Sequence, residues 1–368
     1  GCVSAVARPD GIDWLYMAIM AGKSASTASR TVIMAIIVRM DRGLVNFIEF
    51  DRAFLYLTRH RKRTSMEIDK VAEENAVVGE GPIWNSDQQA LIWTDIHTGR
   101  LFSFDPGTGE NRQIHSGFNV GGLMQNASGG YACFIWDGVV LWNSDDDWVR
   151  VQPESFEGQP LRFNDVIAAP DGSAFAGTYL SEEKGRLYHV GTDGALRIVE
   201  EGVGCSNGMG FSPDLKTMYF TDAMAREIYA YDFKAETAVL SNRRLFVKLS
   251  AEDGVPDGMT VDAEGFVWSA NWFGSCIIRF DPEGREERRI ATPAKQTSSV
   301  MFGGKDLDEL YFTSAAFDCP QGSDLDPIGY DWDAYGMSYR GGGLFRIRGL
   351  NIQGKAEFKS NFTRPVDA

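Results

Sequence analysis

The chain has 368 residues, of which 43% are hydrophobic, 12% aromatic and 24% charged, so it can bury one large core or two ordinary ones. This composition excludes low complexity and intrinsic disorder as a description of the whole chain. The net charge of −15 argues against a nucleic-acid or anionic-membrane partner, because both carry negative charge themselves.

The first 65 residues differ in charge from the rest of the chain. They hold ten Lys and Arg against five Asp and Glu, a net of +5, which leaves −20 for residues 66–368. We therefore predict an N-terminal extension at 1–65, disordered or not native, and one domain at 66–368. A targeting segment is the alternative, since Ser-, Thr- and Ala-rich leaders with arginines act as import signals. The apolar run at 31–38 is too short to span a bilayer, which requires about 20 residues.

From Gly79 onward one pattern recurs: an alternating strand, an Asp or Gly turn, a second strand, a connector and a third strand. Its copies start about 40 to 50 residues apart, which is the period of a four-stranded propeller blade. The first strands of the copies begin near Gly81, Gly122, Asn164, Asn207, Asp257 and Ser299. Six copies predict an all-β fold, a six-bladed β-propeller with four-stranded blades around a central channel.

Residues at the same position in different blades converge at one mouth of the channel, because the innermost strands run alongside it. In four blades that position holds Glu80, Asn164, Asn207 and Asp257. Two carboxylates and two carboxamides form an oxygen-rich site for one divalent cation; Ca²⁺ fits best, and Zn²⁺, Mn²⁺ and Mg²⁺ are alternatives. A simpler interpretation is that a repeat places turn residues such as Asn and Asp at equal positions for structural reasons. Glu80 is a poor turn former, which argues against it.

Four short segments resemble, in order along the chain, the signature of the senescence-marker-protein/gluconolactonase/luciferin-regenerating family. They are Glu80-Gly81-Pro82, Arg162-Phe163-Asn164-Asp165, Ser206-Asn207-Gly208-Met209 and Pro256-Asp257-Gly258-Met259. The resemblance covers about residues 77–350 and implies hydrolysis of sugar-acid lactones. It also implies one catalytic metal held by Glu80, Asn207 and Asp257, with Asn164 beside it. The family usually has Gly where this chain has Val166, a change beside the substrate that bears on specificity more than on metal binding.

A lactone is an activated ester, and its hydrolysis at such a site gives each polar residue a role. Asp257 is the predicted catalytic base, because a carboxylate at the metal can take the proton of the attacking water. Arg162 and Asn164 are predicted to bind substrate through sugar hydroxyls or the ring oxygen. Glu182 is predicted to bind a distal hydroxyl; the alternative is a solvated loop acid beside Glu183. The expected substrates are of the gluconolactone, arabinonolactone or xylonolactone type.

Three other functions fit parts of the sequence. Residues 204–208 match the Gly-x-Ser-x-Gly nucleophile elbow, but that motif needs a strand, a turn and a helix, and here a strand and an Asp turn follow. A non-enzymatic binding platform is an alternative, because Trp93-Thr94-Asp95 and Phe220-Thr221-Asp222 resemble the repeats of receptor propellers. Phosphotriester hydrolysis is another, because the oxygen cage resembles that of diisopropylfluorophosphatase.

Cysteines and histidines bear on location and metal chemistry. The five cysteines are scattered without a Cys-x-x-Cys pair, which is typical of reduced thiols, so we predict a cytoplasmic protein. Four histidines are too few for a His-rich catalytic metal site, and His97, His115 and His189 are predicted to be structural. The expected partner is a small sugar lactone, with no nucleic acid and no membrane, and the chain is expected to be a monomer or small homo-oligomer.

Overall fold

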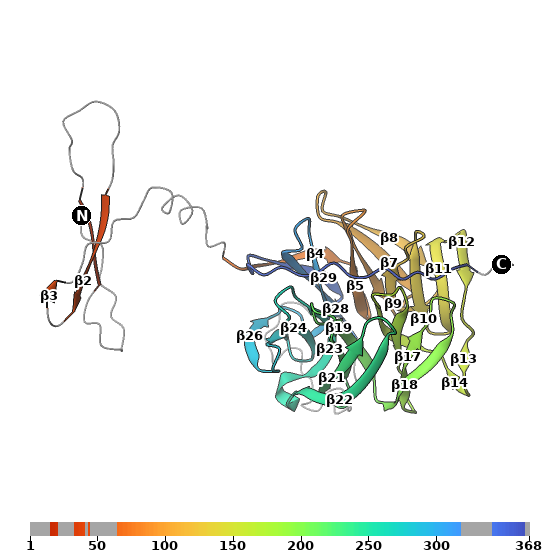
Figure 1. The fold of residues 1–368 in the computed structure, drawn as a ribbon. Coiled ribbons are helices and arrows are strands. Elements are labelled where there is room, and N and C mark those ends of the chain that lie inside the picture. The colour runs from red at the N-terminus through yellow and green to blue at the C-terminus, as the bar shows by residue number, and fades with distance from the viewer. Residues whose placement is uncertain (1–14, 21–32, 41–42, 45–64, 318–340, 365–368) are drawn as a thin grey trace. The chain divides into compact units, whose positions relative to one another are not determined.

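Tight turns fold this chain into antiparallel sheets (Figure 1). The computed structural model describes residues 15–20, 33–40, 43–44, 65–317 and 341–364. The chain divides into two compact units, Gly1–Ser65 and Met66–Ala368. In the first unit, one antiparallel sheet contains β1 (Leu15–Met20), β2 (Ile33–Met40) and β3 (Gly43–Leu44). The rest of this extension lies outside the described residues, so its origin stays a prediction. In the described parts of the chain, no helix is long and apolar enough to cross a membrane.

Six sets of four antiparallel strands form the blades of a propeller, as the six sequence copies predict (Figure 1). Blade one contains β5 (Gly79–Asn85), β6 (Ala90–Asp95), β7 (Arg100–Asp105) and β8 (Glu110–Ser116), and blade two contains β9 (Val120–Gln125), β10 (Tyr131–Ile135), β11 (Gly138–Ser144) and β12 (Asp147–Arg150). Blade three contains β15 (Phe163–Ala168), β16 (Ala174–Thr178), β17 (Gly185–Val190) and β18 (Leu196–Val203), and blade four contains β19 (Ser206–Phe211), β20 (Thr217–Asp222), β21 (Glu227–Lys234) and β22 (Val239–Lys248).

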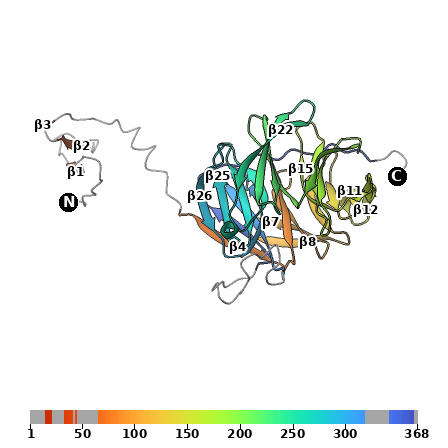
Figure 2. The same ribbon diagram turned by 90° about the horizontal axis from the view of Figure 1, so that it is seen from below.

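Blade five contains β23 (Val255–Val261), β24 (Val267–Trp272), β25 (Cys276–Phe280) and β26 (Glu286–Ala291). A short hairpin of β13 (Ser155–Phe156) and β14 (Gln159–Pro160) precedes blade three, and a 3₁₀ turn, η1 (Ala251–Asp253), precedes blade five. In Figure 2 the fourth strands β8, β12, β22 and β26 lie around the outside of the propeller. The first strand of each blade is therefore innermost, and its residues face the channel.

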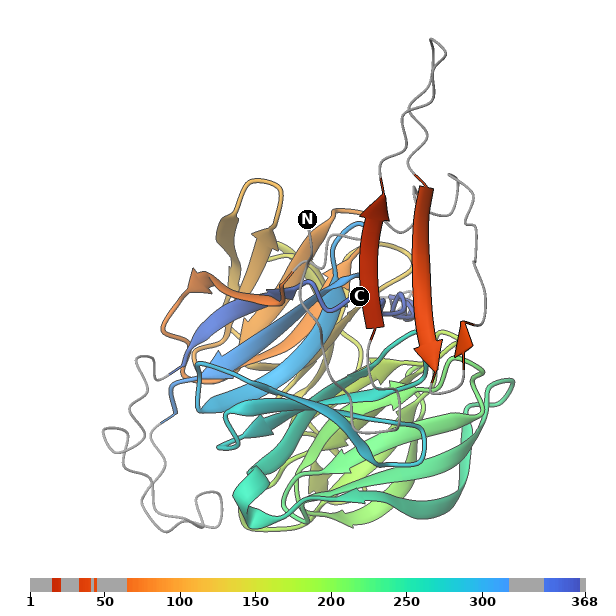
Figure 3. The same cartoon turned by 90° about the vertical axis from the view of Figure 1, so that its left-hand side faces the viewer.

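Blade six is completed by a strand from the beginning of the domain. Its inner strands are β27 (Gln296–Gly303), β28 (Glu309–Ala315) and β29 (Gly343–Arg348), and its fourth is β4 (Glu67–Glu73). Strand β4 pairs antiparallel with β29, with Ile68 opposite Ile347, and the orange and blue strands lie side by side in Figures 1 and 3. This pairing ties the start of the domain to its last blade, so the ring closes non-covalently. Strand β4 was not predicted from the sequence.

The first strands can approach one another closely because glycines line their contacts. Strands β19 and β23 are buried along their whole length, since neighbouring blades cover both faces. A Cβ atom added to Gly208 would lie 2.6 Å from the carbonyl oxygen of Asp257, and one added to Gly258 would lie 2.0 Å from Oγ of Ser299. A larger residue at either position would push neighbouring blades apart, and the ring of polar residues at the channel mouth would widen.

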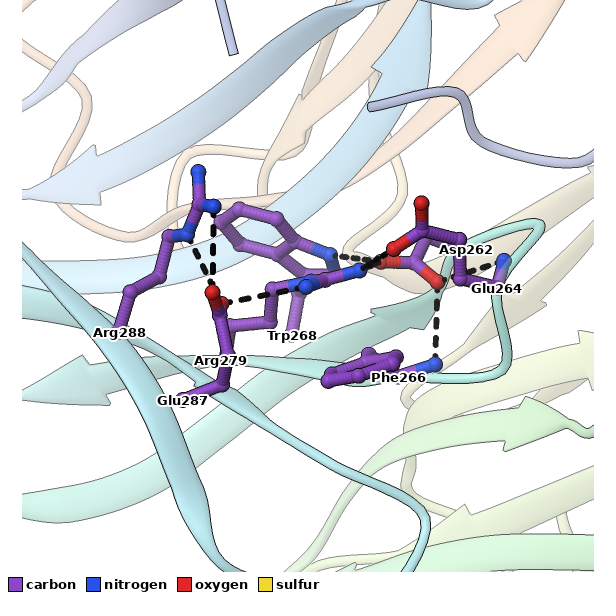
Figure 4. A network of polar contacts seen from close by, with 7 residues as sticks. All are labelled: Asp262, Glu264, Phe266, Trp268, Arg279, Glu287 and Arg288. Atoms are coloured by element: carbon purple, nitrogen blue, oxygen red, sulfur yellow. Dashed lines mark hydrogen bonds and ion pairs between the residues drawn. The ribbon is translucent and has the colours of Figure 1, made fainter. Parts of the chain in front are cut away.

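A buried ion pair fixes the first turn of blade five (Figure 4). The Asp262 carboxylate accepts hydrogen bonds from Nε and Nη2 of Arg279 at 2.9 and 2.6 Å and from the indole N–H of Trp268 at 2.9 Å. Asp262 is 0% and Arg279 3% exposed, and the guanidinium lies 3.7 Å from the ring centroid of Phe266. Each buried charge thus has its partners, as it must at this depth. The network holds the turn between β23 and β24.

The last described segment, residues 350–362, crosses the channel at the end opposite to the predicted ligands, and we call it the strap. Its Glu357 and Phe358 line a small cavity there together with residues of the first strands. The strap contacts all six blades through Lys359 to Asp87, Ser360 to Gln125, Asn361 to Gly172, Lys355 to Phe211, Gln353 to Ala263 and Gly354 to Leu307. Phe362 is buried at its end. The strap therefore links the blades and covers this end of the channel.

We expect residues 66–368 to fold without the N-terminal extension, because every blade strand, β4 included, begins after Ser65. A chain that starts at Asn75 should unfold at a lower temperature, since it leaves one edge of β29 unpaired. Thermal unfolding of the chains 1–368, 66–368 and 75–368, followed by circular dichroism, measures both effects. An insoluble 66–368 chain, or equal melting temperatures for 66–368 and 75–368, would contradict this expectation.

Candidate active site

A cavity of about 630 Å³ opens at the channel mouth formed by the beginnings of the first strands. All six residues that the sequence analysis selected line it: Glu80, Arg162, Asn164, Glu182, Asn207 and Asp257. Four of them lie on β5, β15, β19 and β23, one strand from each of four blades. Arg162 directly precedes β15, and Glu182 lies in the exposed loop between β16 and β17. Residues far apart in the sequence thus meet at one place.

A β-bulge or similar irregularity lies at or directly after each of the four strand residues. The pairing of first and second strands shifts between Glu80 and Ile83, Phe163 and Val166, Asn207 and Met209, and Pro256 and Met259, so Glu80 and Asn207 are paired just before the shift and Asn164 and Asp257 lie within it. A bulge inserts an extra residue and turns the local side chains in a new direction. The shift after Glu80 includes Gly81, whose φ of 50° lies in the left-handed region that glycine adopts at little cost. The glycines of the signature therefore have a backbone role beside the polar side chains.

The two carboxamides hold each other in place. Nδ2 of Asn164 donates to Oδ1 of Asn207 at 2.9 Å and to the carbonyl oxygen of Ser206 at 2.9 Å. Among the residues that the structure describes, none donates a hydrogen bond to Oδ1 of Asn164, and Oδ1 of Asn207 keeps one lone pair for a further partner. Glu80 accepts one hydrogen bond from the backbone N–H of Gly81 at 2.9 Å. Oxygen atoms from all three side chains are thus available to a ligand in the cavity.

The two carboxylates are buried together, with Glu80 8% and Asp257 5% exposed. Burial raises the pKa of Glu80 to about 8, with a further contribution from the charge of Asp165. Burial and then the charge of Glu80 raise the pKa of Asp257 well above its usual range. Both carboxylates can be ionised together only at a high cost unless a positive charge lies beside them.

The chemistry of these donors fits a hard divalent cation. Among the residues that the structure describes, no three His, Cys, Asp or Glu side chains form a group that could hold a metal. The available donors are instead two carboxylates and two carboxamide oxygens, the ligand types that Ca²⁺ prefers. A divalent cation would also supply the positive charge that the buried pair lacks. The residues present therefore fit such an ion, and its ligands would be Glu80, Asn207 and Asp257 with Asn164 beside them.

An aromatic wall positions Arg162 above these ligands. Its guanidinium carbon lies 4.0 Å from the ring centroid of Trp136 and 5.6 Å from that of Tyr179, and Nη1 donates to the Tyr179 carbonyl oxygen at 3.2 Å. His97 packs edge-on against Trp136 at 5.3 Å and also contacts Phe317. Arg162 thus has a fixed position and N–H groups left over for a ligand.

This wall was not predicted from the sequence, and His97 was expected to have only a structural role. The missed residues share one location, because each stands at or just after the end of a second strand: His97, Trp136, Tyr179, Met224, Trp272 and Phe317. The repeat does indicate these residues, because the position that follows the second strand faces the same mouth as the beginning of the first strand. Both positions of each blade therefore predict residues that line the cavity.

Two sequence observations are interpreted differently once the structure is described. Val166 was expected to lie beside the substrate. It instead lines the small cavity next to the strap and not the large cavity, so this expectation was wrong. Ser206, of the apparent nucleophile elbow, is fully buried in β19, and a Cβ added to Gly177 would lie 1.6 Å from its Oγ. A strand follows it, so it cannot act as an exposed nucleophile.

The Thr-Asp pairs at the ends of second strands anchor the chain before the next polar residue. The Asp95 carboxylate accepts from the backbone N–H groups of Val77 and Val78 at 3.2 and 3.0 Å. Asp222 accepts in the same way from Gly204 and Cys205. These acids therefore hold the segments that lead into Glu80 and Asn207.

Known proteins are similar to this chain over the whole propeller. Residues 78–316 match the family described as the SMP-30/gluconolactonase/LRE-like region. The chain is 39% identical over 297 residues to pentonolactonase XacC of Haloferax volcanii, a match that covers 80% of this chain and 99% of that protein. It resembles the structure of a luciferin-regenerating enzyme with a TM-score of 0.71 and 26% identity, covering 81% of this chain and 100% of that one. The calcium-binding protein regucalcin of Agrobacterium tumefaciens has a similar fold, with a TM-score of 0.67, 24% identity and coverage of 80% and 97%.

The raised pKa of Glu80 predicts that the cation-free protein loses stability as the pH rises. Between pH about 4.5 and 8 the folded state holds a proton that the unfolded state releases, so the free energy of unfolding falls with pH. Each such proton contributes at most about 1.4 kcal/mol per pH unit. Denaturant unfolding in chelator at pH 5 to 8 measures the slope. Glu80→Gln should flatten it, and an unchanged slope in that variant would assign the proton to another group.

Proposed function

We propose, from the premise that this chain belongs to the SMP-30/gluconolactonase/LRE-like family, that it hydrolyses a sugar lactone to the aldonic acid with a bound divalent cation. The family membership confirms the resemblance found in the sequence, and a lactonase-family hydrolase is the coarse function that follows from it. The observation that carries the proposal is the convergence of two buried carboxylates and two carboxamides in one cavity. The similarity of the chain to a pentonolactonase favours a five-carbon sugar lactone among the expected substrates.

The cation would be held by Glu80, Asn207 and Asp257, with Asn164 beside them. When bound, a divalent cation stabilises the negative charge that develops on the lactone carbonyl oxygen during attack by water. Ca²⁺ is the proposed ion because all donors are oxygen atoms, and Zn²⁺, Mn²⁺ and Mg²⁺ are the alternatives. A cytoplasmic location and a monomer or small homo-oligomer belong to the same proposal.

Proton transfer and substrate binding are assigned to side chains of this chain. Asp257 accepts the proton of the attacking water, because its carboxylate lies in the cavity and is sheltered from bulk solvent. Arg162 donates hydrogen bonds to oxygen atoms of the lactone from its fixed place against Trp136. Asn164 positions the same ring through its free carboxamide oxygen, and the exposed Glu182 accepts from a distal hydroxyl at the rim.

A panel of lactones tests the function. Acid release from gluconolactone, arabinonolactone and xylonolactone is measured with the protein in chelator, and again after Ca²⁺, Zn²⁺, Mn²⁺ or Mg²⁺ is added back, with subtraction of uncatalysed hydrolysis. We expect activity that chelation abolishes and one ion restores. Activity on a phosphotriester alone would assign the site to that chemistry. Tight lactone binding without turnover would support a binding platform.

Removal of individual ligands should weaken cation binding. Glu80→Gln removes a negative charge and Asn207→Ala removes an oxygen, and charge and ligand number set the affinity of oxygen sites. We expect each to raise the Kd for the restoring ion by at least about tenfold in calorimetric titration of the cation-free protein. Glu182→Gln is the matched control, because it removes a carboxylate from the same cavity outside the ligand set. Wild-type affinity in both ligand variants would place the ion elsewhere.

The role of Asp257 is tested by Asp257→Asn, which keeps an oxygen atom but cannot accept a proton near neutral pH. General-base assistance is worth about 10²–10⁴ in rate, so kcat at saturating cation should fall by that factor. Asn164→Ala should instead raise KM more than it lowers kcat, since it removes a positioning contact. Initial rates on the best lactone give both constants. If Asp257→Asn keeps wild-type kcat, Asp257 is not the base.

A further inference from the structure

The sulfur of Cys205 lies against both carboxamides of the proposed cation site. Nδ2 of Asn207 donates to Sγ at 3.8 Å. Nδ2 of Asn164 lies 4.0 Å from Sγ, but its two N–H groups already donate to the Ser206 carbonyl oxygen and to Oδ1 of Asn207, both at 2.9 Å. Cys205 lines the large cavity and is half-buried, whereas the described cysteines Cys133 and Cys276 are buried outside it. The mechanism above gives Cys205 no role.

The backbone holds this thiol in one place. The Asp222 carboxylate accepts from the N–H groups of Gly204 and Cys205, and the carbonyl oxygen of Cys205 accepts from Ala223 at 2.9 Å. The anchors on both sides come from the end of β20, which is a buried strand. The backbone that carries Sγ is therefore anchored on both sides of Cys205.

A hydrogen-bond acceptor at this point favours one of the two orientations of the Asn207 carboxamide. A side-chain amide can be turned by half a rotation about its last bond, which exchanges oxygen and nitrogen. Nδ2 of Asn164 donates to the Ser206 carbonyl oxygen and to Oδ1 of Asn207, and these two bonds set the orientation of the Asn164 amide. With Nδ2 of Asn207 on the sulfur, its Oδ1 faces Asn164 and the cavity. A turned amide would present N–H groups where a cation needs oxygen.

The sulfur acts through the amides rather than as a ligand. Cys205 does not form a metal-holding group with the buried acids, since no such group of three exists among the described side chains. Its hydrogen-bond donor is the nitrogen end of one proposed ligand, Asn207. The thiol thus contacts the side of Asn207 opposite to the oxygen atom that would bind the ion.

We propose that Cys205 is a positioning residue of the cation site, whose sulfur accepts from Nδ2 of Asn207 and so keeps Oδ1 of Asn207 available to the ion. This inference rests on the proposed function, because it requires that Asn207 faces a bound cation. It assigns a role to a residue within the sequence that had suggested a nucleophile elbow. The active element of that segment is Cys205, as an acceptor, and not Ser206.

Three substitutions of Cys205 distinguish the loss of the hydrogen-bond acceptor from the loss of side-chain volume. Cys205→Ala and Cys205→Val both remove the acceptor, and Cys205→Val preserves most of the volume. Cys205→Ser keeps an acceptor, on a Cβ–Oγ bond that is shorter than the Cβ–Sγ bond. The matched control is Cys276→Ala, because Sγ of Cys276 also accepts from an asparagine, Asn271, at 3.7 Å, but lies outside the cavity. Each variant is first shown to be folded by its thermal transition.

Calorimetric titration of the cation-free full chain with Ca²⁺, and in parallel with Mn²⁺ and Zn²⁺, gives the readout. We expect the Kd to rise about two- to tenfold in Cys205→Ala and Cys205→Val, the range of one neutral hydrogen bond. Cys205→Ser should restore much of the affinity, and Cys276→Ala should bind as wild type while its melting temperature falls. In lactone hydrolysis the variants should need more ion for half-maximal rate yet reach a similar kcat when saturated.

Two results would overturn the inference. If wild type binds an ion and folded Cys205→Ala and Cys205→Val bind it equally well, the sulfur has no positioning role and the proposed function stands. The inference is also wrong if Cys276→Ala weakens binding as much as Cys205→Ala, because the effect is then general to losing a thiol. If wild type binds none of the three ions and chelation does not affect lactone hydrolysis, the cation site itself fails, and this inference fails with it.

Discussion

Two carboxylates buried side by side are the constraint around which the propeller's polar mouth is organised. Burial opposes the ionised forms of Glu80 and Asp257, and the charge of Glu80 adds to this for Asp257. Left alone, such a pair would favour any movement that separates the two strands or lets water in. The glycine contacts, the closing pair of β4 and β29, and the strap all oppose that movement. The scaffold thus keeps together two groups that repel each other when both are ionised.

Much of the fold and the centre of the site could be predicted from the sequence because both follow from one repeat. The period gives the number of blades, and equal position within the period gives convergence at the channel. Glu80 and Asp257 lie 177 residues apart in the numbering, yet the same position in two blades was enough to bring them together. The roles of these residues stay predictions, since the geometry brings them together without a ligand present.

Features that break the repeat could not be predicted in this way. Strand β4 belongs to the last blade in space but precedes the first in sequence, and no local pattern in residues 67–73 indicates its partner. The strap has no regular structure for most of its length, and its contacts depend on where six separate turns lie. The wall around Arg162 is different, because Trp136 and His97 stand at the same position of two blades, just after a second strand, and could have been found from the repeat. Position within a blade was therefore informative for the strands and the channel mouth and uninformative for β4 and the strap.

The strap makes the two ends of the channel unequal. Among the residues that the structure describes, Glu357 and Phe358 lie at one end, and the cavity beside the proposed ligands opens at the other. Under the proposed function, lactone would enter and acid would leave at the mouth beside Arg162, so substrate and product would compete for the same opening.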